Sequence, residues 1–141
     1  MIVSTREKGF TLVELLVVLV ILGLLMTIVA IKVLPTIDTA KVDKAKADVA
    51  MLEQAVELFR LGTQGYPTSA DGLQALVTAP SSLTRPELYQ RGGYVKRLPN
   101  DPWGRPYVYV QPGTHGPFDI YSLGADGTAG GEADNADVGN W

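Results

Sequence analysis

The sequence predicts an α+β protein in which a long N-terminal helix packs against a small antiparallel β-sheet head. Three observations lead to this fold class: an apolar run over residues 10–31, an amphipathic helical stripe over residues 42–59, and short strand-like segments after residue 93. The chain has 141 residues, a length that suits one globular domain of ordinary size. Only the second half of the helix is expected to pack on the head.

The composition argues against several functional classes. The 12 Lys and Arg against 15 Asp and Glu give a formal charge of −3, which argues against nucleic-acid binding through bulk positive charge. The absence of Cys excludes disulfides, a thiol nucleophile and a thiolate metal site. The sequence shows no phosphate loop, metal-hydrolase motif or paired general acid and base, and no Ser and Asp constellation around its one His. We therefore expect that the chain is not an enzyme. His115 and Asp101 are expected to be turn residues.

The apolar run is 22 residues long and contains a single charge, Glu14. As a helix it would span about 33 Å, enough to cross the hydrocarbon core of a bilayer. Arg6 and Lys8 precede it, and positive residues there favour a cytoplasmic N-terminus with the rest of the chain on the far side. A secretory signal peptide is the alternative, but the run is longer than an ordinary signal core and lacks a good cleavage site. We expect a single-pass membrane segment.

A plain membrane anchor leaves Glu14 unexplained. A carboxylate at the centre of a membrane helix costs on the order of 3 kcal/mol, although less near the interface. Ionisable residues in such a segment usually have a partner, and residues 10–31 contain no cation before Lys32. A specific role for Glu14 is therefore expected.

The residues around Glu14 carry a resemblance to a known family. The heptapeptide KGFTLVE at residues 8–14, followed by the apolar stretch, resembles the class III signal of type IV pilins and pseudopilins. The resemblance implies that a prepilin peptidase cuts between Gly9 and Phe10 and methylates Phe10, so that residues 1–9 are a cleaved leader. The new α-amino group, with an unperturbed pKa of about 8, would be the missing cation. By pairing with Glu14 of a neighbouring subunit it would favour one filament register, because buried charges are costly unless they pair.

The rest of the chain is expected to form one head. The amphipathic stripe predicts a helix over residues 10–61, gently broken at Pro35. Residues 10–34 would be the hydrophobic transmembrane and filament-core part, and residues 35–141 the globular head.

Shorter elements are expected within the head. Residues 72–79 predict a short helix that Ser69 or Asp71 can cap. Strands are predicted at residues 94–98, 107–110 and 118–122, with turn residues between them.

Motifs in the head narrow the resemblance to one branch of the family. The segments YPT (66–68), GLQAL (72–76), DPWG (101–104), DIYSLG (119–124) and DVGNW (137–141) resemble the major pseudopilins of the type II secretion system. The lack of Cys agrees with this branch, since adhesive pilins usually close a C-terminal loop with a disulfide. The likeness covers nearly the whole chain.

This resemblance implies a structural role. The chain would be a single-pass inner-membrane protein with a periplasmic head, polymerising into a filament that assists export of folded proteins across the outer membrane of a Gram-negative bacterium. Implied partners are further copies of the chain, minor pseudopilins, prepilin peptidase, the inner-membrane secretion platform and, before assembly, membrane lipid, but no nucleic acid. A minor pseudopilin or a type IV pilin is the alternative within the family. A membrane-anchored enzyme or calcium-binding module is the alternative from another class.

The C-terminal residues 123–141 are rich in Gly and acidic residues. They contain five Gly and the four carboxylates Asp126, Glu132, Asp134 and Asp137. Such a segment buries little apolar surface, so a flexible solvated tail is one interpretation. Against it, Trp141 offers a hydrophobic anchor, and clustered carboxylates repel one another unless a cation lies between them. Because Ca²⁺ takes about 6–8 oxygen ligands, the composition leaves a calcium loop and a flexible tail both open.

The family resemblance favours Ca²⁺ in this segment, since major pseudopilins of this kind bind calcium there. Carried over to this sequence, the implied ligands are the carboxylates of Asp126 and Asp137 and the backbone carbonyls of Leu123 and Thr128. Asp134 is a further candidate, because the stretch between the matching motifs varies in length across the family.

Overall fold

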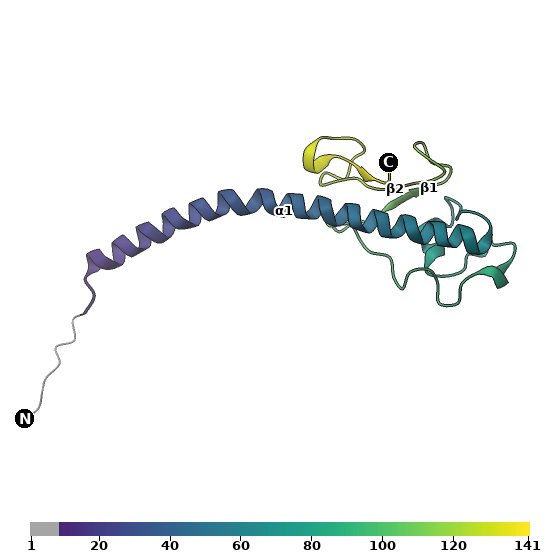
Figure 1. Cartoon of the computed structure of the whole chain (residues 1–141). Helices are drawn as coiled ribbons and strands as arrows, with labels where there is room; N and C mark the ends of the chain where they lie inside the picture. Colours follow the sequence, from purple (N-terminus) through teal and green to yellow (C-terminus); the bar gives the residue numbers. More distant parts are fainter. Residues whose placement is uncertain (1–8) are drawn as a thin grey trace, which may run out of the picture. The chain divides into compact units, whose positions relative to one another are not determined.

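The computed structural model describes residues 9–141, apart from the side chains of residues 30–36 (Figure 1). It contains two compact units, of which the first ends at Ile37 and the second covers Asp38–Trp141. Helix α1, Leu12–Thr63, belongs to both units. The predicted leader, apart from Gly9, lies outside the described residues.

The first unit contains the apolar half of α1. Within the described part of the chain, Leu12–Val29 is the stretch long and apolar enough to cross a membrane, with a mean hydropathy of 3.0. None of this window is buried. Its Leu, Val and Ile side chains are exposed on all sides of the helix, a pattern typical of a membrane span or of the interior of a larger assembly.

Both ends of α1 lie within two residues of the prediction. The helix begins at Leu12 and ends at Thr63. The backbone stays helical through Pro35, so the helix is not interrupted there, and the bend expected at this residue stays a prediction. Gln64 then takes a left-handed φ of 66°, and its N–H donates to the Arg60 carbonyl oxygen at 2.8 Å, a common way to end a helix.

The second half of α1 forms one wall of the hydrophobic core. The predicted stripe is confirmed from Ala45 onward, where Ala45, Leu52 and Val56 are completely buried. The other side of the core comes from Leu73, Leu76, Tyr109, Phe118 and Ile120. A helix face packed against a small sheet is the predicted α+β arrangement.

The head contains a three-stranded antiparallel sheet in the order β1-β2-β3. The strands are β1 (Val108–Val110), β2 (Asp119–Ser122) and β3 (Val138–Gly139). Tyr109 pairs with Ile120, and Ser122 pairs with Val138. The central strand β2 therefore leads directly into the acidic segment, and β3 follows that segment.

The strand predicted at residues 94–98 is wrong. The N–H groups of Tyr94 and Val95 both donate to the carbonyl oxygen of Leu76, at 2.7 and 3.1 Å, so this segment is tied to a helical turn instead of a neighbouring strand. The third strand is β3, where the sequence offers only two pairing residues and one of them is Gly139.

The predicted helix at residues 72–79 is a shorter 3₁₀ turn, η1 (Gly72–Leu76). Asp71 takes the N-cap position as predicted, but its side chain makes no capping hydrogen bond. The Ser69 hydroxyl instead accepts from the Gln111 N–H at 2.7 Å and donates to the Gln111 carbonyl at 2.9 Å. Two further 3₁₀ turns are η2 (Pro86–Leu88) and η3 (Ala133–Asn135).

Candidate functional site

The predicted cleavage site lies just before α1. Gly9 and Phe10 are exposed and precede the first helical residue, Leu12. Phe10 has 83 % of its surface exposed. The peptide bond between them is therefore in an accessible, non-helical segment.

Glu14 closes a capping box at the start of α1. Its Oε2 accepts from the Thr11 N–H at 2.8 Å and from the Thr11 hydroxyl at 3.1 Å, while the Thr11 Oγ1 accepts from the Glu14 N–H at 3.2 Å. This reciprocal pair satisfies N–H groups that a helix start leaves free. Sequence reasoning missed this second role, although Thr-x-x-Glu before an apolar run is its usual signature.

The residues between β2 and β3, 123–137, form an acidic loop that places the predicted ligands at different points along its length. Asp126 Oδ1 accepts from the Thr128 N–H at 3.0 Å, and Asp137 Oδ2 accepts from the Gly130 N–H at 2.9 Å. Hydrogen bonds from Thr128 lower the pKa of Asp126, and the positive charge of Arg105 adds to this effect. Asp134 contributes its backbone, since its carbonyl accepts from the Ala125 N–H at 2.8 Å.

The loop fits a cation in part. The described residues form no group of three or more His, Cys, Asp and Glu side chains arranged to hold a metal, so Asp126, Asp134 and Asp137 do not make such a cluster. However, Asp137 Oδ1 is buried and accepts no hydrogen bond from any residue in the described part of the chain. A buried carboxylate oxygen without a donor is costly, and a cation would satisfy it.

Asp101 links the loop to the preceding turn. As predicted, it is a turn residue: its Oδ1 accepts from the N–H groups of Trp103 at 3.1 Å and Arg105 at 2.7 Å. Its Oδ2 accepts from the Ser122 hydroxyl at 2.6 Å, which sequence reasoning missed. Because the two residues are 21 positions apart, no local sequence pattern predicts this hydrogen bond.

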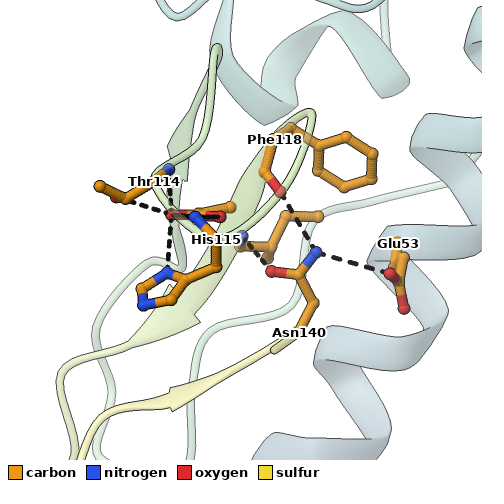
Figure 2. A network of polar contacts seen from close by, with 7 residues as sticks. Glu53, Thr114, His115, Phe118 and Asn140 are labelled. Carbon is orange, nitrogen blue, oxygen red and sulfur yellow. Dashed lines mark hydrogen bonds and ion pairs between the residues drawn. The ribbon is translucent and has the colours of Figure 1, made fainter.

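The C-terminus is held to the central strand by Asn140 (Figure 2). Its N–H donates to the Ile120 carbonyl at 3.2 Å, and its Oδ1 accepts from the Ile120 N–H at 3.0 Å. Its Nδ2 donates to the Phe118 carbonyl at 3.3 Å and points toward Glu53 of α1, 3.5 Å from Oε1. The end of the acidic segment is therefore paired, which argues against a flexible tail there.

Asp119 organises the turn before β2. Its buried carboxylate accepts from the Thr114 N–H at 2.8 Å, the Thr114 hydroxyl at 3.0 Å and the His115 N–H at 3.2 Å (Figure 2). Burial alone would raise the pKa of Asp119, but these hydrogen bonds outweigh it, so the pKa is lowered. His115 is thus the turn residue predicted.

Trp141, predicted as a hydrophobic anchor, contacts two neighbouring rings but keeps 54 % of its surface exposed. Its ring stacks on His115 with centroids 3.9 Å apart and planes 13° apart, and it meets Tyr121 edge-on at 5.7 Å. The contact fixes the last residue beside the Asp119 turn.

Comparison with known proteins first defines the class of protein. Residues 4–30 match the model of the prokaryotic N-terminal methylation motif. This match covers the predicted cleavage site, Glu14 and the apolar half of α1. The chain is thus a subunit of the pilin-like kind, with an apolar N-terminal helix and a small α+β head.

The head defines the particular family. Residues 32–141 match the model of type II secretion system protein G. Over 136 residues the chain is 48 % identical to the type II secretion system core protein G of Pseudomonas aeruginosa, covering 96 % of both chains. It is 47 % identical to the protein of the same name from Vibrio cholerae, covering 96 % of this chain and 92 % of the relative. The chain belongs to the type II secretion system protein G family.

A solved structure agrees with this assignment. The crystal structure of the major pseudopilin from the type 2 secretion system of enterohaemorrhagic Escherichia coli matches with a TM-score of 0.66 and 39 % sequence identity. The match covers 76 % of this chain and 91 % of that chain. The predicted family and its structural role as a pseudopilin subunit are therefore confirmed.

Proposed function

We propose that the chain is the repeating subunit of a periplasmic pseudopilus that assists export of folded proteins across the outer membrane. The observation that carries this proposal is the apolar half of α1, of which no residue in Leu12–Val29 is buried, followed in the chain by a head that matches a major pseudopilin. Such a surface is stable only against lipid or other apolar helices. The chain would therefore reside in the inner membrane before assembly, with its head in the periplasm. Its apolar helix would then move from the membrane into a filament.

Maturation would precede assembly. A prepilin peptidase would remove residues 1–9 at the exposed bond before Phe10 and methylate the new amino group. The match of residues 4–30 to the methylation motif supports this step. Minor pseudopilins and the inner-membrane secretion platform would be the further partners, and the structural role involves no catalysis.

Glu14 would then act in assembly. Among the residues that the structure describes, its carboxylate is held by Thr11, a neutral partner. The amino group of Phe10 in a neighbouring subunit would supply the opposite charge. An ion pair in apolar surroundings is strongly favoured over a single buried charge, so it would select one register between subunits.

Calcium would fasten the acidic loop of the head. Asp126 and Asp137 with the carbonyls of Leu123 and Thr128 are the proposed ligands, and Asp134 is a further candidate. The partnerless Asp137 Oδ1 supports the proposal. When bound, the ion would supply positive charge among carboxylates, and it would stabilise the head because it binds the folded loop only.

Intact-mass measurement of the membrane-extracted protein tests the proposal at its first step. We expect the loss of residues 1–9 and the gain of one methyl group. The same cells should then secrete exoproteins, whereas cells lacking the chain should retain them in the periplasm. An unprocessed chain, or unchanged secretion without it, would rule out this function.

A further inference from the structure

We propose that Asp101 and Arg105 are positioning residues for the acidic loop. They hold the turn Gly124–Gly127, which follows Leu123 and contains Asp126, in the conformation that presents the ligands. This inference rests on the proposed calcium site and assigns to it two residues that are not ligands.

The first connection runs from Asp101 through Ser122. Asp101 is 4 % exposed and Ser122 is completely buried. The Ser122 hydroxyl donates to Asp101 Oδ2 at 2.6 Å and accepts from the Gly124 N–H at 3.3 Å. Because a buried carboxylate needs its hydrogen bonds, Asp101 fixes the hydroxyl, and the hydroxyl fixes the N–H of Gly124.

The second connection runs through Arg105. Its Nη2 donates to the carbonyl oxygen of Gly124, and its Nε lies 4.0 Å from Asp101 Oδ2. Gly124 is thereby held at both its N–H and its carbonyl oxygen. Since Gly124 follows Leu123 in the chain, this clamp also limits the directions available to the Leu123 carbonyl, a proposed ligand.

The far end of the turn also rests on Arg105. Gly127 has a φ of 70°, and a Cβ built there would lie 2.9 Å from Arg105 Nη1. The flat guanidinium group therefore lies close to the turn, and a side chain at Gly127 would have to displace it. A lysine ammonium has neither this flat shape nor the forked donor geometry.

The position of Arg105 has two opposite effects on calcium binding. The positive charge of Arg105 repels a second cation, while its hydrogen bond to Gly124 orders the loop before binding. The Arg105 side chain is 37 % exposed, so solvent and salt screen its charge. The hydrogen bond to Gly124 is partly buried and is screened less. Ordering is therefore expected to dominate, so that Arg105 raises calcium affinity.

The test is calcium titration by calorimetry on the full mature chain in detergent. We expect Arg105→Gln and Ser122→Ala each to weaken binding by about tenfold, the effect of losing one well-placed hydrogen bond to a charged or buried partner. Ser69→Ala is the matched control. It also removes two hydrogen bonds to backbone, at Gln111, but away from the loop. It should lower the melting temperature and leave the dissociation constant unchanged.

A second set of variants tests the contact between Gly127 and Arg105 in the absence of calcium. Gly127→Ala and Gly130→Ala both place a side chain at a positive φ, 70° and 91°, but only the first meets Arg105. Gly127→Ala should therefore lower the calcium-free melting temperature, and an Arg105→Gln background should reduce this loss. The loss caused by Gly130→Ala, whose Cβ would meet no neighbouring atom, should be the same in both backgrounds.

The outcomes separate the two proposals. If the unaltered chain binds calcium and Arg105→Gln binds it equally or more tightly, the positioning role is overturned and the calcium proposal stands. If the unaltered chain binds no calcium, both are overturned. An equal loss for Gly127→Ala in the unaltered and the Arg105→Gln backgrounds would remove the contact on which the role of Arg105 depends.

Discussion

The carboxylate of Glu14 is proposed to have different partners before and after assembly. In the single chain it caps α1 together with Thr11. In the proposed filament its charge would meet the amino group of a neighbour. The first role needs only a hydrogen-bond acceptor, whereas the second needs a negative charge, so substitution can separate them.

We expect Glu14→Gln to insert into the membrane normally and to fail in filament assembly. Glutamine still completes a capping box, so the start of α1 should be preserved. Only the ion pair is lost, and without it the α-amino group of the neighbour has no counter-charge. Membrane fractionation and electron microscopy of filaments measure the two effects. Glu14→Ala, which also removes the cap, is the comparison; filaments of normal length in Glu14→Gln would assign the role to capping alone.

Single residues also show where prediction from sequence stops. The gathering of acidic residues in one short segment points to that segment, and the family resemblance singles out Asp126 and Asp137 within it. Arg105 and Asn140 could not be singled out, because their contacts reach Gly124, 19 positions away, and Glu53, 87 positions away. Those contacts exist only once the strands have paired.

Among the elements, α1 was the most predictable because its pattern repeats over many turns. Its apolar run and buried stripe both follow helical spacing, and the ends were found within two residues. The third strand was missed because β3 has two residues and is defined by its pairing with Tyr121 and Ser122. Residues 94–98 look like a strand by composition, but tertiary hydrogen bonds to Leu76 override that preference.

The turn between β1 and β2 should make the head sensitive to acid. The folded state lowers the pKa of Asp119 below its ordinary value of 3.8, so the unfolded chain takes up the proton first. The stabilisation is complete above that value and is lost as the pH falls through the folded pKa. The melting temperature should therefore fall as the pH drops below about 4.

Asp119→Asn is expected to lower stability at pH 7 and to flatten the acid dependence. The amide keeps the shape of the side chain but loses the charge that the N–H groups of Thr114 and His115 stabilise. Thermal unfolding between pH 7 and pH 3 measures both effects. Asp43→Asn, at an exposed position of α1, is the control and should follow the unaltered chain. Parallel curves for all three proteins would contradict the assignment.

At the scale of the whole molecule, calcium removal should loosen the head and weaken the filament. A ligand present at about 100 times its dissociation constant stabilises a folded protein by about 2.7 kcal/mol. We expect a chelator to lower the melting temperature accordingly and to reduce filament yield. Asp126→Ala should melt at the same temperature with and without chelator.

Glu132→Ala serves as the matched control for that experiment. Glu132 is an exposed acidic residue of the same loop and is not a proposed ligand. This variant should keep the response to chelator. A chelator effect in Asp126→Ala as large as in the unaltered chain would exclude Asp126 from the site.

The exposed apolar surface of Leu12–Val29 has a consequence for the direction of transfer. Lipid tails are as apolar as Leu and Val, so moving this helix from bilayer to filament changes its hydrophobic free energy little. The transfer is then a move between two apolar environments of similar free energy, so it can proceed in either direction. Its direction would be set by the few polar groups present and by whatever work the secretion apparatus performs on the head. A filament built on such a balance can be extended and withdrawn without exposing the apolar helices of its subunits to water.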